Sequence, residues 1–156
     1  MNLTITNDQS AGMLLELHHQ RLDDMLDDIE LCADAENWSE AKRRFAGFRR
    51  DIEEHIRLEE ELIFPIFEAN AAMPHGPTVV MRAEHVAIRQ TLAAVEAALA
   101  DERPISRTTA ELEAQLAAHN FKEERVLYPA FERLAAAATR AALAATVEAL
   151  LRGRDE

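Results

Sequence analysis

The stretch His55-Ile-Arg-Leu-Glu59-Glu-Glu-Leu-Ile-Phe64-Pro65 recurs further along the chain as His119-Asn-Phe-Lys-Glu123-Glu-Arg-Val-Leu-Tyr128-Pro129. In each copy a histidine and a glutamate are separated by one helical turn, so on a helix they lie on the same face. A neutral imidazole and a carboxylate held in this way form a bidentate arm for a transition metal. The repeat therefore predicts two helices that each carry half of the protein ligands of a metal site.

The composition predicts one helical domain over residues 1–156. A chain of 156 residues is long enough for a well-buried core. It has only four glycines and five prolines, which is typical of a mostly helical protein. The formal charge of −12 argues against nucleic acid or an anionic membrane as a partner. The single Cys32 excludes a multi-thiolate metal site, so a metal must be held by nitrogen and oxygen.

The sequence also indicates where the protein works. The residues after Met1 show no basic segment followed by an apolar run, so no signal peptide is predicted. No stretch approaches the apolar length of a membrane span. We therefore expect a cytoplasmic protein.

Capping and helix-breaking residues divide the chain into four long helices and a short fifth one. The predicted helices run from Asp8 or Ser10 to about Glu36, from Ser39 to near Asn70, from Thr78 to Asp101, from Ser106 to about Leu134, and from there to Gly153. A turn is predicted at residues 72–77 and a break at residues 101–104. Because short connections make neighbouring helices antiparallel, the predicted fold is an all-α, up-down-up-down four-helix bundle with a short C-terminal fifth helix.

Polar residues occupy positions in these helices that should face the core. The positions that recur every three or four residues are, in the second helix, Phe45, Phe48, Ile52, His55, Glu59, Leu62 and Ile66; in the third, Thr78, Met81, His85, Ile88, Leu92, Val95 and Leu99; in the fourth, Thr109, Leu112, Leu116, His119, Glu123, Val126 and Ala130. An apolar residue belongs at each of these positions. Both His–Glu pairs and His85 are therefore predicted inside the bundle.

The first helix allows two interpretations. One core-facing series is Leu15, His19, Leu22, Leu26, Ile29 and Ala33; the other is Leu15, His18, Leu22, Met25, Ile29 and Cys32. One of the two adjacent histidines should point inward, and periodicity does not decide which.

These ligands should lie at one level of the bundle. His19 precedes the end of its helix at Glu36 by almost the same number of residues as His55 follows the start of its helix at Ser39. In the other half, His85 precedes Asp101 by more residues than His119 follows Ser106, and by fewer residues than Glu123 follows Ser106. At about 1.5 Å of rise per residue, all four helices deliver ligands to the same height.

Buried carboxylates at that level require a cation. An ionised carboxylate in an apolar interior costs several kcal/mol without a partner, and no lysine or arginine shares a seam with Glu59 or Glu123 at their level. Four histidines and two glutamates are too many ligands for one tetrahedral zinc and too rich in nitrogen for calcium or magnesium. Two metals that each take two histidines and share both glutamates use every ligand. Such surroundings suit non-haem iron, with manganese or zinc as other occupants.

The motif order resembles one family of helical metal proteins. Ferritin-like bundles carry Glu-x-x-His on two helices, and here only Glu16 and His19 have that spacing. The twice-occurring His-x-x-x-Glu-Glu-x-x-x-aromatic-Pro, with Glu84-His85-x-x-Ile88-Arg89 between the copies, instead resembles the hemerythrin-like family, the HHE cation-binding domains. The likeness covers nearly the whole chain.

The resemblance implies a role in metal binding for each of the six residues. It implies that His19 and His55 hold one iron, that His85 and His119 hold the other, and that Glu59 and Glu123 bridge them, with an oxo or hydroxo group completing the core. The phrase His19-Gln-Arg-Leu22-Asp23 is similar to the family pattern of the first helix and favours His19 over His18.

Two departures from the family pattern limit which members of the family the chain resembles. Oxygen-carrying hemerythrins have a second histidine where this chain has Arg89. A set of four His and two Glu is more similar to the bacterial iron-centre-repair proteins and to iron- or stress-linked members. Those repair proteins also carry an N-terminal cysteine-bearing segment that this sequence lacks.

The function expected on this basis is to bind or sense a small diatomic ligand, O2 or NO, or to handle iron under oxidative or nitrosative stress. The alternatives are a di-iron enzyme acting on peroxide or NO, and a plain metal-storage or structural-metal module.

The remaining residues near the repeat are expected to have ordinary roles. Glu60, Glu61 and Glu124 are expected to form a solvated flank, with a bond to a ligand histidine as the alternative. Tyr128 is expected to pack as its counterpart Phe64 does, with donation to a bridging ligand as the alternative. The six phenylalanines are expected in the core: Phe45, Phe48, Phe64, Phe67, Phe121 and Phe131.

Overall fold

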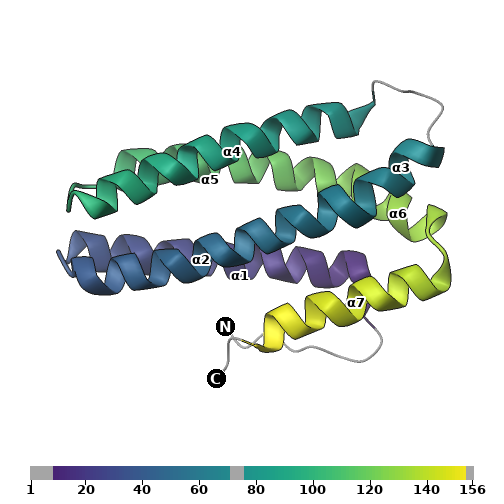
Figure 1. Ribbon diagram of the computed structural model, residues 1–156, viewed down its shortest axis with the longest axis horizontal. Coiled ribbons are helices and arrows are strands. Elements are labelled where there is room, and N and C mark those ends of the chain that lie inside the picture. Colours follow the sequence, from purple (N-terminus) through teal and green to yellow (C-terminus); the bar gives the residue numbers. More distant parts are fainter. Residues whose placement is uncertain (1–8, 71–75, 154–156) are drawn as a thin grey trace.

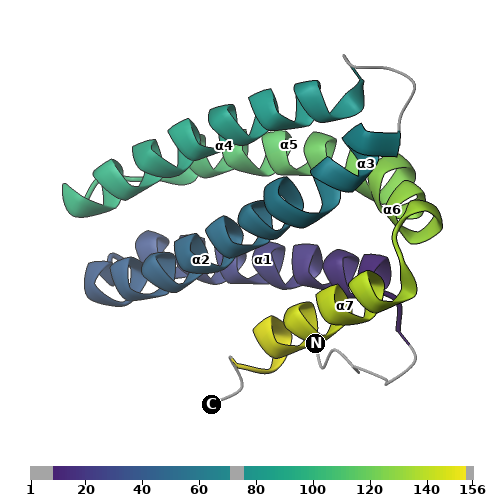
Figure 2. The same ribbon diagram turned by 45° about the vertical axis from the view of Figure 1, so that its right-hand side comes forward.

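The computed structural model describes residues 9–70 and 76–153, and these residues form two antiparallel helical hairpins that lie side by side (Figure 1; Figure 2). In one hairpin α1 (Ala11–Asp34) packs against α2 (Trp38–Leu58). In the other, α4 (Pro77–Ala100) packs against α5 (Ser106–Lys122). No strand occurs in the described part of the chain. The predicted all-α four-helix bundle is confirmed.

Four long helical segments, which we call rods, form the bundle: one starts with each of α1, α2, α4 and α5. The second and fourth rods each contain a wide, π-helical turn. The turn η1 (Glu59–Ile63) joins α2 to α3 (Phe64–Asn70), and η2 (Glu123–Leu127) joins α5 to α6 (Tyr128–Leu134). Both turns begin at the glutamate of the repeated motif.

The prolines of the repeat favour these wide turns. Pro65 and Pro129 lie just beyond the turns, as the second residue of α3 and of α6. A proline ring inside a regular helix collides with the carbonyl four residues earlier and leaves that carbonyl without its N–H donor. In the π turns the N–H of the residue before each proline bonds the carbonyl five residues earlier.

The extra residue in each π turn moves the core-facing series by one position. The predicted core positions Leu62 and Val126 are wrong, because their side chains are 40% and 47% exposed. Their successors Ile63 and Leu127 are fully buried instead. The π turns also bring Phe64 and Tyr128 into the interior, next to the polar layer described below.

The fifth helix, α7 (Ala137–Arg152), lies across α1 at one end of the bundle (Figure 1). Its buried side chains join an apolar cluster with the start of α1, and the Arg21 guanidinium donates to the carbonyl of Leu151 at 2.8 Å. The helix ends at Gly153, as predicted.

The helix starts agree only partly with the predicted caps. The Ser10 hydroxyl accepts from the N–H of Met13 at 3.2 Å, so Ser10 caps α1. Ser39 and Thr78 are wrong as caps: α2 starts one residue before Ser39, and α4 starts at Pro77, which suits the first helical position. Ser106 is the first residue of α5 and makes no capping bond. Asp8 and residues 72–75 of the predicted turn lie outside the described residues.

The rotation of α1 decides between the two predicted series. Leu26 and Ala33, which belong to the His19 series, are buried, whereas Met25 and Cys32 of the His18 series are only partly buried. The His19 series therefore faces the core. His18 is nevertheless buried as well, at 1% exposure.

Two apolar clusters fill the bundle above and below the level of the histidines. One contains Phe45 and Phe48 with side chains from the four long helices, and the other contains Phe64 and Phe131 near α7. Phe121 is 57% exposed, so its predicted place in the core is wrong. None of the described helices has the length and apolar composition that a membrane span needs.

The first helix of each hairpin is followed by a residue with the same left-handed backbone conformation, which allows a test of stability. Glu36 and Glu102 follow α1 and α4 with φ of 55° and 54°, a left-handed conformation that costs a residue with a Cβ about 1–2 kcal/mol and that glycine adopts readily.

We expect Glu36→Gly to raise the free energy of unfolding by up to about 1 kcal/mol, since part of the gain is offset by the freedom of glycine in the unfolded chain. Urea denaturation measures the change. Glu36→Ala is the matched control, because alanine keeps the strained Cβ. A glycine variant no more stable than the alanine variant would contradict this interpretation.

Candidate metal centre

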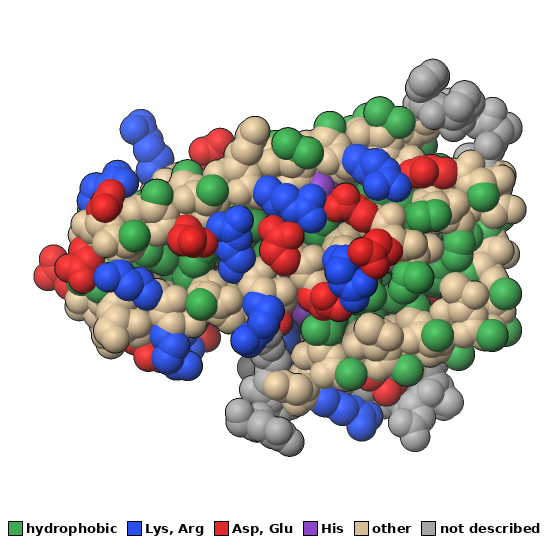
Figure 3. All heavy atoms as spheres, in the orientation of Figure 1, with side chains coloured by type: hydrophobic (Ala, Val, Ile, Leu, Met, Phe, Trp, Pro, Cys, Tyr) green, Lys and Arg blue, Asp and Glu red, His purple; other side chains and the backbone are tan. Residues whose placement is uncertain are grey.

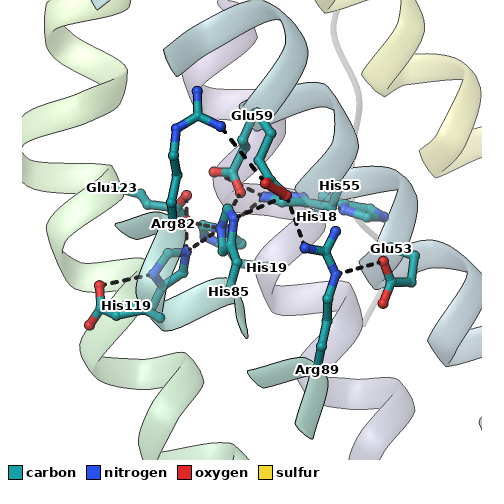
Figure 4. Close-up of polar contacts among 12 residues, drawn as sticks. His18, His19, Glu53, His55, Glu59, Arg82, His85, Arg89, His119 and Glu123 are labelled. Atoms are coloured by element: carbon teal, nitrogen blue, oxygen red, sulfur yellow. Dashed lines mark hydrogen bonds and ion pairs between the residues drawn. The ribbon is translucent and has the colours of Figure 1, made fainter. Parts of the chain in front are cut away.

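A layer of polar side chains crosses the middle of the bundle (Figure 4). It contains one histidine from each of α1, α2, α4 and α5, together with the glutamates that open the two π turns. These six residues are His19, His55, Glu59, His85, His119 and Glu123, and none is more than 4% exposed. On the surface in Figure 3 only slivers of histidine show between charged side chains of both signs.

The six side chains form two overlapping groups. One group consists of His19, His55, Glu59 and Glu123, and the other of His85, His119 and the same two glutamates. Within each group the nitrogen and oxygen atoms that could bind a metal lie within 4.8 Å of one another.

Each glutamate turns one oxygen toward each group. Glu59 places Oε2 at 3.6 Å from His55 Nε2 and Oε1 at 3.4 Å from His85 Nε2. Glu123 places Oε1 at 3.2 Å from His19 Nε2 and Oε2 at 3.2 Å from His119 Nε2. This is the arrangement that two carboxylates need in order to bridge two metal ions.

The spacing of the nitrogens also fits metal binding. The Nε2 atoms of His19 and His55 are 3.1 Å apart, and those of His85 and His119 are 3.0 Å apart. Two donors at right angles on a metal with bonds of about 2.1 Å are separated by about 3 Å. The layer thus has room for one ion within each group.

Every one of the four histidines has a polar partner at its outer nitrogen, Nδ1. Glu124 Oε1 lies 3.3 Å from Nδ1 of His19, and Glu84 Oε1 lies 3.2 Å from Nδ1 of His119. Glu60 Oε1 faces Nδ1 of His85 at 3.6 Å, which is too long for a hydrogen bond. A carboxylate within hydrogen-bond distance, as beside His19 and His119, holds the proton on Nδ1 and leaves the Nε2 lone pair free for a metal.

Two of these carboxylates follow the alternative expectation. Glu60 and Glu124 are half-buried against the histidines rather than part of a solvated flank, whereas Glu61 is exposed. Arg89 also belongs to this outer layer, because it donates to Glu53 and Glu60 at 3.1 Å each. The arginine therefore helps to hold Glu60 in place.

His18 is the fourth outer partner. Its Nδ1 lies 2.7 Å from Nδ1 of His55, and the two rings are stacked with centroids 5.0 Å apart. One of these nitrogens must donate and the other accept, and donation by His55 leaves its Nε2 lone pair directed at the centre. The structure therefore places His19 in the inner layer and His18 behind His55.

The protonation states suit metal binding. Burial lowers the pKa of His55, and burial lowers the pKa of His119 to about 4. Both imidazoles are therefore neutral at pH 7, the form in which histidine binds metals. Burial alone would raise the pKa of Glu59, but the neighbouring His55 and His85 lower it below its usual value, so Glu59 is ionised.

The two buried carboxylates lack a cationic partner from the protein. Within residues 9–70 and 76–153, Glu59 and Glu123 make ion-pair contacts only with histidines. Glu59 Oε1 and Glu123 Oε2 are buried and accept no hydrogen bond from the described residues. Each is the oxygen that faces the His85 and His119 group. Metal ions between the two groups would satisfy both oxygens, and the donor set fits them.

Tyr128 is a polar member of this layer, in agreement with the alternative expectation that it donates to a bridging ligand rather than only packs. Its hydroxyl donates to Glu59 Oε2 at 2.9 Å and is within 3.1 Å of Nε2 of both His19 and His55. Burial, together with the charge of Glu59, raises the pKa of the phenol well above its ordinary value. The signal in the sequence was the aromatic residue five positions after each glutamate, but only the π turn points it at the centre.

A small cavity adjoins the layer on the side away from Tyr128. Its volume is about 20 Å³, which is room for one molecule of roughly water size. Aliphatic side chains from all four rods line it: Leu22, Ile52, Ile56, Ile88 and Leu116. The exposed Asp23 of α1 and the partly buried Asn120 of α5 also line it.

Comparison with known proteins agrees with the site. The family model for the hemerythrin HHE cation binding domain matches residues 13–131. This range spans the four rods and includes all six residues of the inner layer. No curated protein and no solved structure matches the chain.

The lowered pKa of His119 predicts how the metal-free protein responds to acid. Between pH 6.5 and 4 the unfolded chain binds a proton at this histidine and the folded chain does not, so the stability falls as the pH falls. From pH 7 to pH 5 this one group should cost about 2 kcal/mol.

Urea denaturation of metal-free protein at the two pH values measures this loss. His119→Gln removes the titrating group, so the variant should be spared this part of the loss of stability over the same interval. Equal losses in both proteins would show that His119 is not held neutral by burial.

Proposed function

The chain belongs to the hemerythrin HHE cation-binding family, and on that premise we propose that it binds two metal ions in its buried polar layer. His19 and His55 hold one ion, His85 and His119 hold the other, and Glu59 and Glu123 bridge them. The observation that carries this proposal is the pair of buried glutamates. Each offers one oxygen to each group, and neither has a cation from the described residues beside it.

We propose iron as the metal. The donors are four imidazole nitrogens and two carboxylates with no thiolate, and such a set suits non-haem iron better than the oxygen-preferring calcium or magnesium. Two ions that share two carboxylates also leave positions at which another molecule can bind. When bound, iron supplies affinity for small diatomic molecules and the ability to exchange electrons with them.

The role of the chain's own residues is to orient the ligands and to restrict access. Glu84, Glu124 and His18 direct histidine lone pairs inward through their contacts with Nδ1. The aliphatic cavity leaves space for one very small molecule and excludes bulky substrates. We therefore propose that the protein binds or senses O2 or NO, or handles iron under oxidative or nitrosative stress. The cytoplasmic location expected from the sequence stays a prediction.

The first test concerns the number of ions. Protein loaded anaerobically with Fe(II) should contain two iron ions per chain by elemental analysis, since the two groups share their bridging glutamates. One tightly held ion, or none, would rule out the dinuclear site.

The bridging glutamates can be tested through stability. Iron should raise the melting temperature of the wild type by mass action, and this shift should be much smaller in Glu59→Gln and Glu123→Gln, because an amide bridges two metals poorly. Glu61→Gln is a matched control, since Glu61 lies in the same π turn but is exposed. Equal iron-dependent shifts in all four proteins would mean that iron binds elsewhere.

The adjacent histidines of α1 should differ in their effects. His19→Ala should lose iron, because it removes a ligand. His18→Ala should keep most of its iron, with an affinity lower by roughly 10- to 100-fold, because it removes only the partner of His55. Iron content after dialysis against a chelator separates the two. The reverse order would mean that α1 is rotated by about 100° from its position here.

A further inference from the structure

The Tyr128 hydroxyl lies close to every metal-binding atom of the group that contains His19 and His55. Its oxygen is within 3.3 Å of the donor atoms of all four residues of that group: His19 Nε2 (3.1 Å), His55 Nε2 (3.1 Å), Glu59 Oε2 (2.9 Å) and Glu123 Oε1 (3.3 Å). A residue that only packed, or that only donated one hydrogen bond, would not need to be equidistant from four metal-binding atoms.

Three contacts among these four atoms have lengths near those expected for neighbouring ligands of one metal. His19 Nε2 is 3.1 Å from His55 Nε2 and 3.2 Å from Glu123 Oε1, and His55 Nε2 is 3.6 Å from Glu59 Oε2. Neighbouring donors at right angles on a metal with bonds of about 2.1 Å are separated by about 3 Å, and a fifth donor at the same separation from all four completes a square pyramid. The Tyr128 oxygen, at 2.9–3.3 Å from the four atoms, lies where a fifth donor to a metal held by them would lie.

The second metal group has no such donor at the equivalent position. The residue equivalent to Tyr128 is Phe64, which also follows the bridging glutamate by five positions and begins the helix after a π turn. The Phe64 ring stacks on His85 with centroids 5.4 Å apart, as the Tyr128 ring stacks on His19 at 5.8 Å. At this position the two halves of the site therefore differ by one oxygen atom.

We propose that the phenolic oxygen of Tyr128 is a fifth protein ligand of the metal held by His19 and His55. The inference rests on the proposed function, because it requires a metal at that position. The phenol releases its proton to solvent when a ferric ion binds, and no electron is transferred in this step. The metal held by His85 and His119 keeps only four protein donors, so it is the more open of the two and the position at which a small molecule binds.

The chain offers a direct test, because Tyr128 is its only tyrosine. Any tyrosinate signal from purified protein therefore comes from this residue. The full chain is loaded with Fe(II), oxidised in air, and examined by visible absorption and resonance Raman spectroscopy. We expect a tyrosinate-to-iron charge-transfer band, with ring vibrations that shift when the protein is grown on ring-deuterated tyrosine.

Tyr128→Phe removes the proposed ligand and little else. It should lose the band and the ring vibrations and still bind two ions, one of which a chelator should remove at least about tenfold more readily than from the wild type. In the double variant Tyr128→Phe/Phe64→Tyr, the phenol moves to the equivalent position of the other group, and the band should return. Its absence there would contradict the claim that this position delivers a donor to the metal.

The outcomes separate this inference from the proposed function. A wild type that binds no buried iron would overturn the proposed function. A wild type with two ions, no tyrosinate vibrations and the same visible spectrum as Tyr128→Phe would overturn this inference alone, and would leave Tyr128 as a hydrogen-bond donor to Glu59.

Discussion

The structure is organised around two carboxylates buried at the centre of a helical bundle. An ionised carboxylate away from water costs several kcal/mol unless charge and hydrogen bonds compensate it. Glu59 and Glu123 are fully buried, and among the described residues the groups that contact them are imidazoles and one phenol rather than lysine or arginine. This imbalance is the physical reason for a metal site. It also explains why each of the four long rods contributes a histidine at the same height.

The surrounding structure serves to hold this layer in place. The π turns start at the two glutamates and rotate the following residues inward, so that Phe64 and Tyr128 close the layer on one side. Aliphatic side chains close it on the other side and leave only a small cavity. Outside, carboxylates and His18 contact the Nδ1 atoms. The two hairpins repeat this plan with two differences. His18 of the first hairpin corresponds to Glu84 of the second, and Phe64 of the first corresponds to Tyr128 of the second.

Much of this arrangement could be predicted from the sequence, because its signals are local. The spacing of His55 and Glu59 predicts a shared helical face, and the rise per residue predicts a common level for the histidines. The alternatives His18 and His19 could not be separated by periodicity, since adjacent helical residues point about 100° apart and both end up buried. The burial of Leu26 and Ala33 shows that His19 faces inward, and the contact with His55 gives His18 its own place.

The parts that could not be predicted depend on the π turns and on contacts between rods. A regular helical period continues through Leu62 and Val126, whereas the structure inserts one residue and buries Ile63 and Leu127 instead. The position of the Tyr128 hydroxyl beside the histidines follows from that inserted residue. Glu60 and Glu124 looked like surface residues because their histidine partners come from other rods, far away in the sequence.

Anomalous X-ray diffraction from a crystal of iron-loaded protein, collected at the iron absorption edge, tests the central claim most directly. We expect two anomalous peaks inside the bundle, roughly 3.5–4 Å apart, one between His19 and His55 and the other between His85 and His119. A single peak in the layer would contradict the dinuclear site. Peaks only at surface carboxylates would show that the buried glutamates are stabilised without a metal.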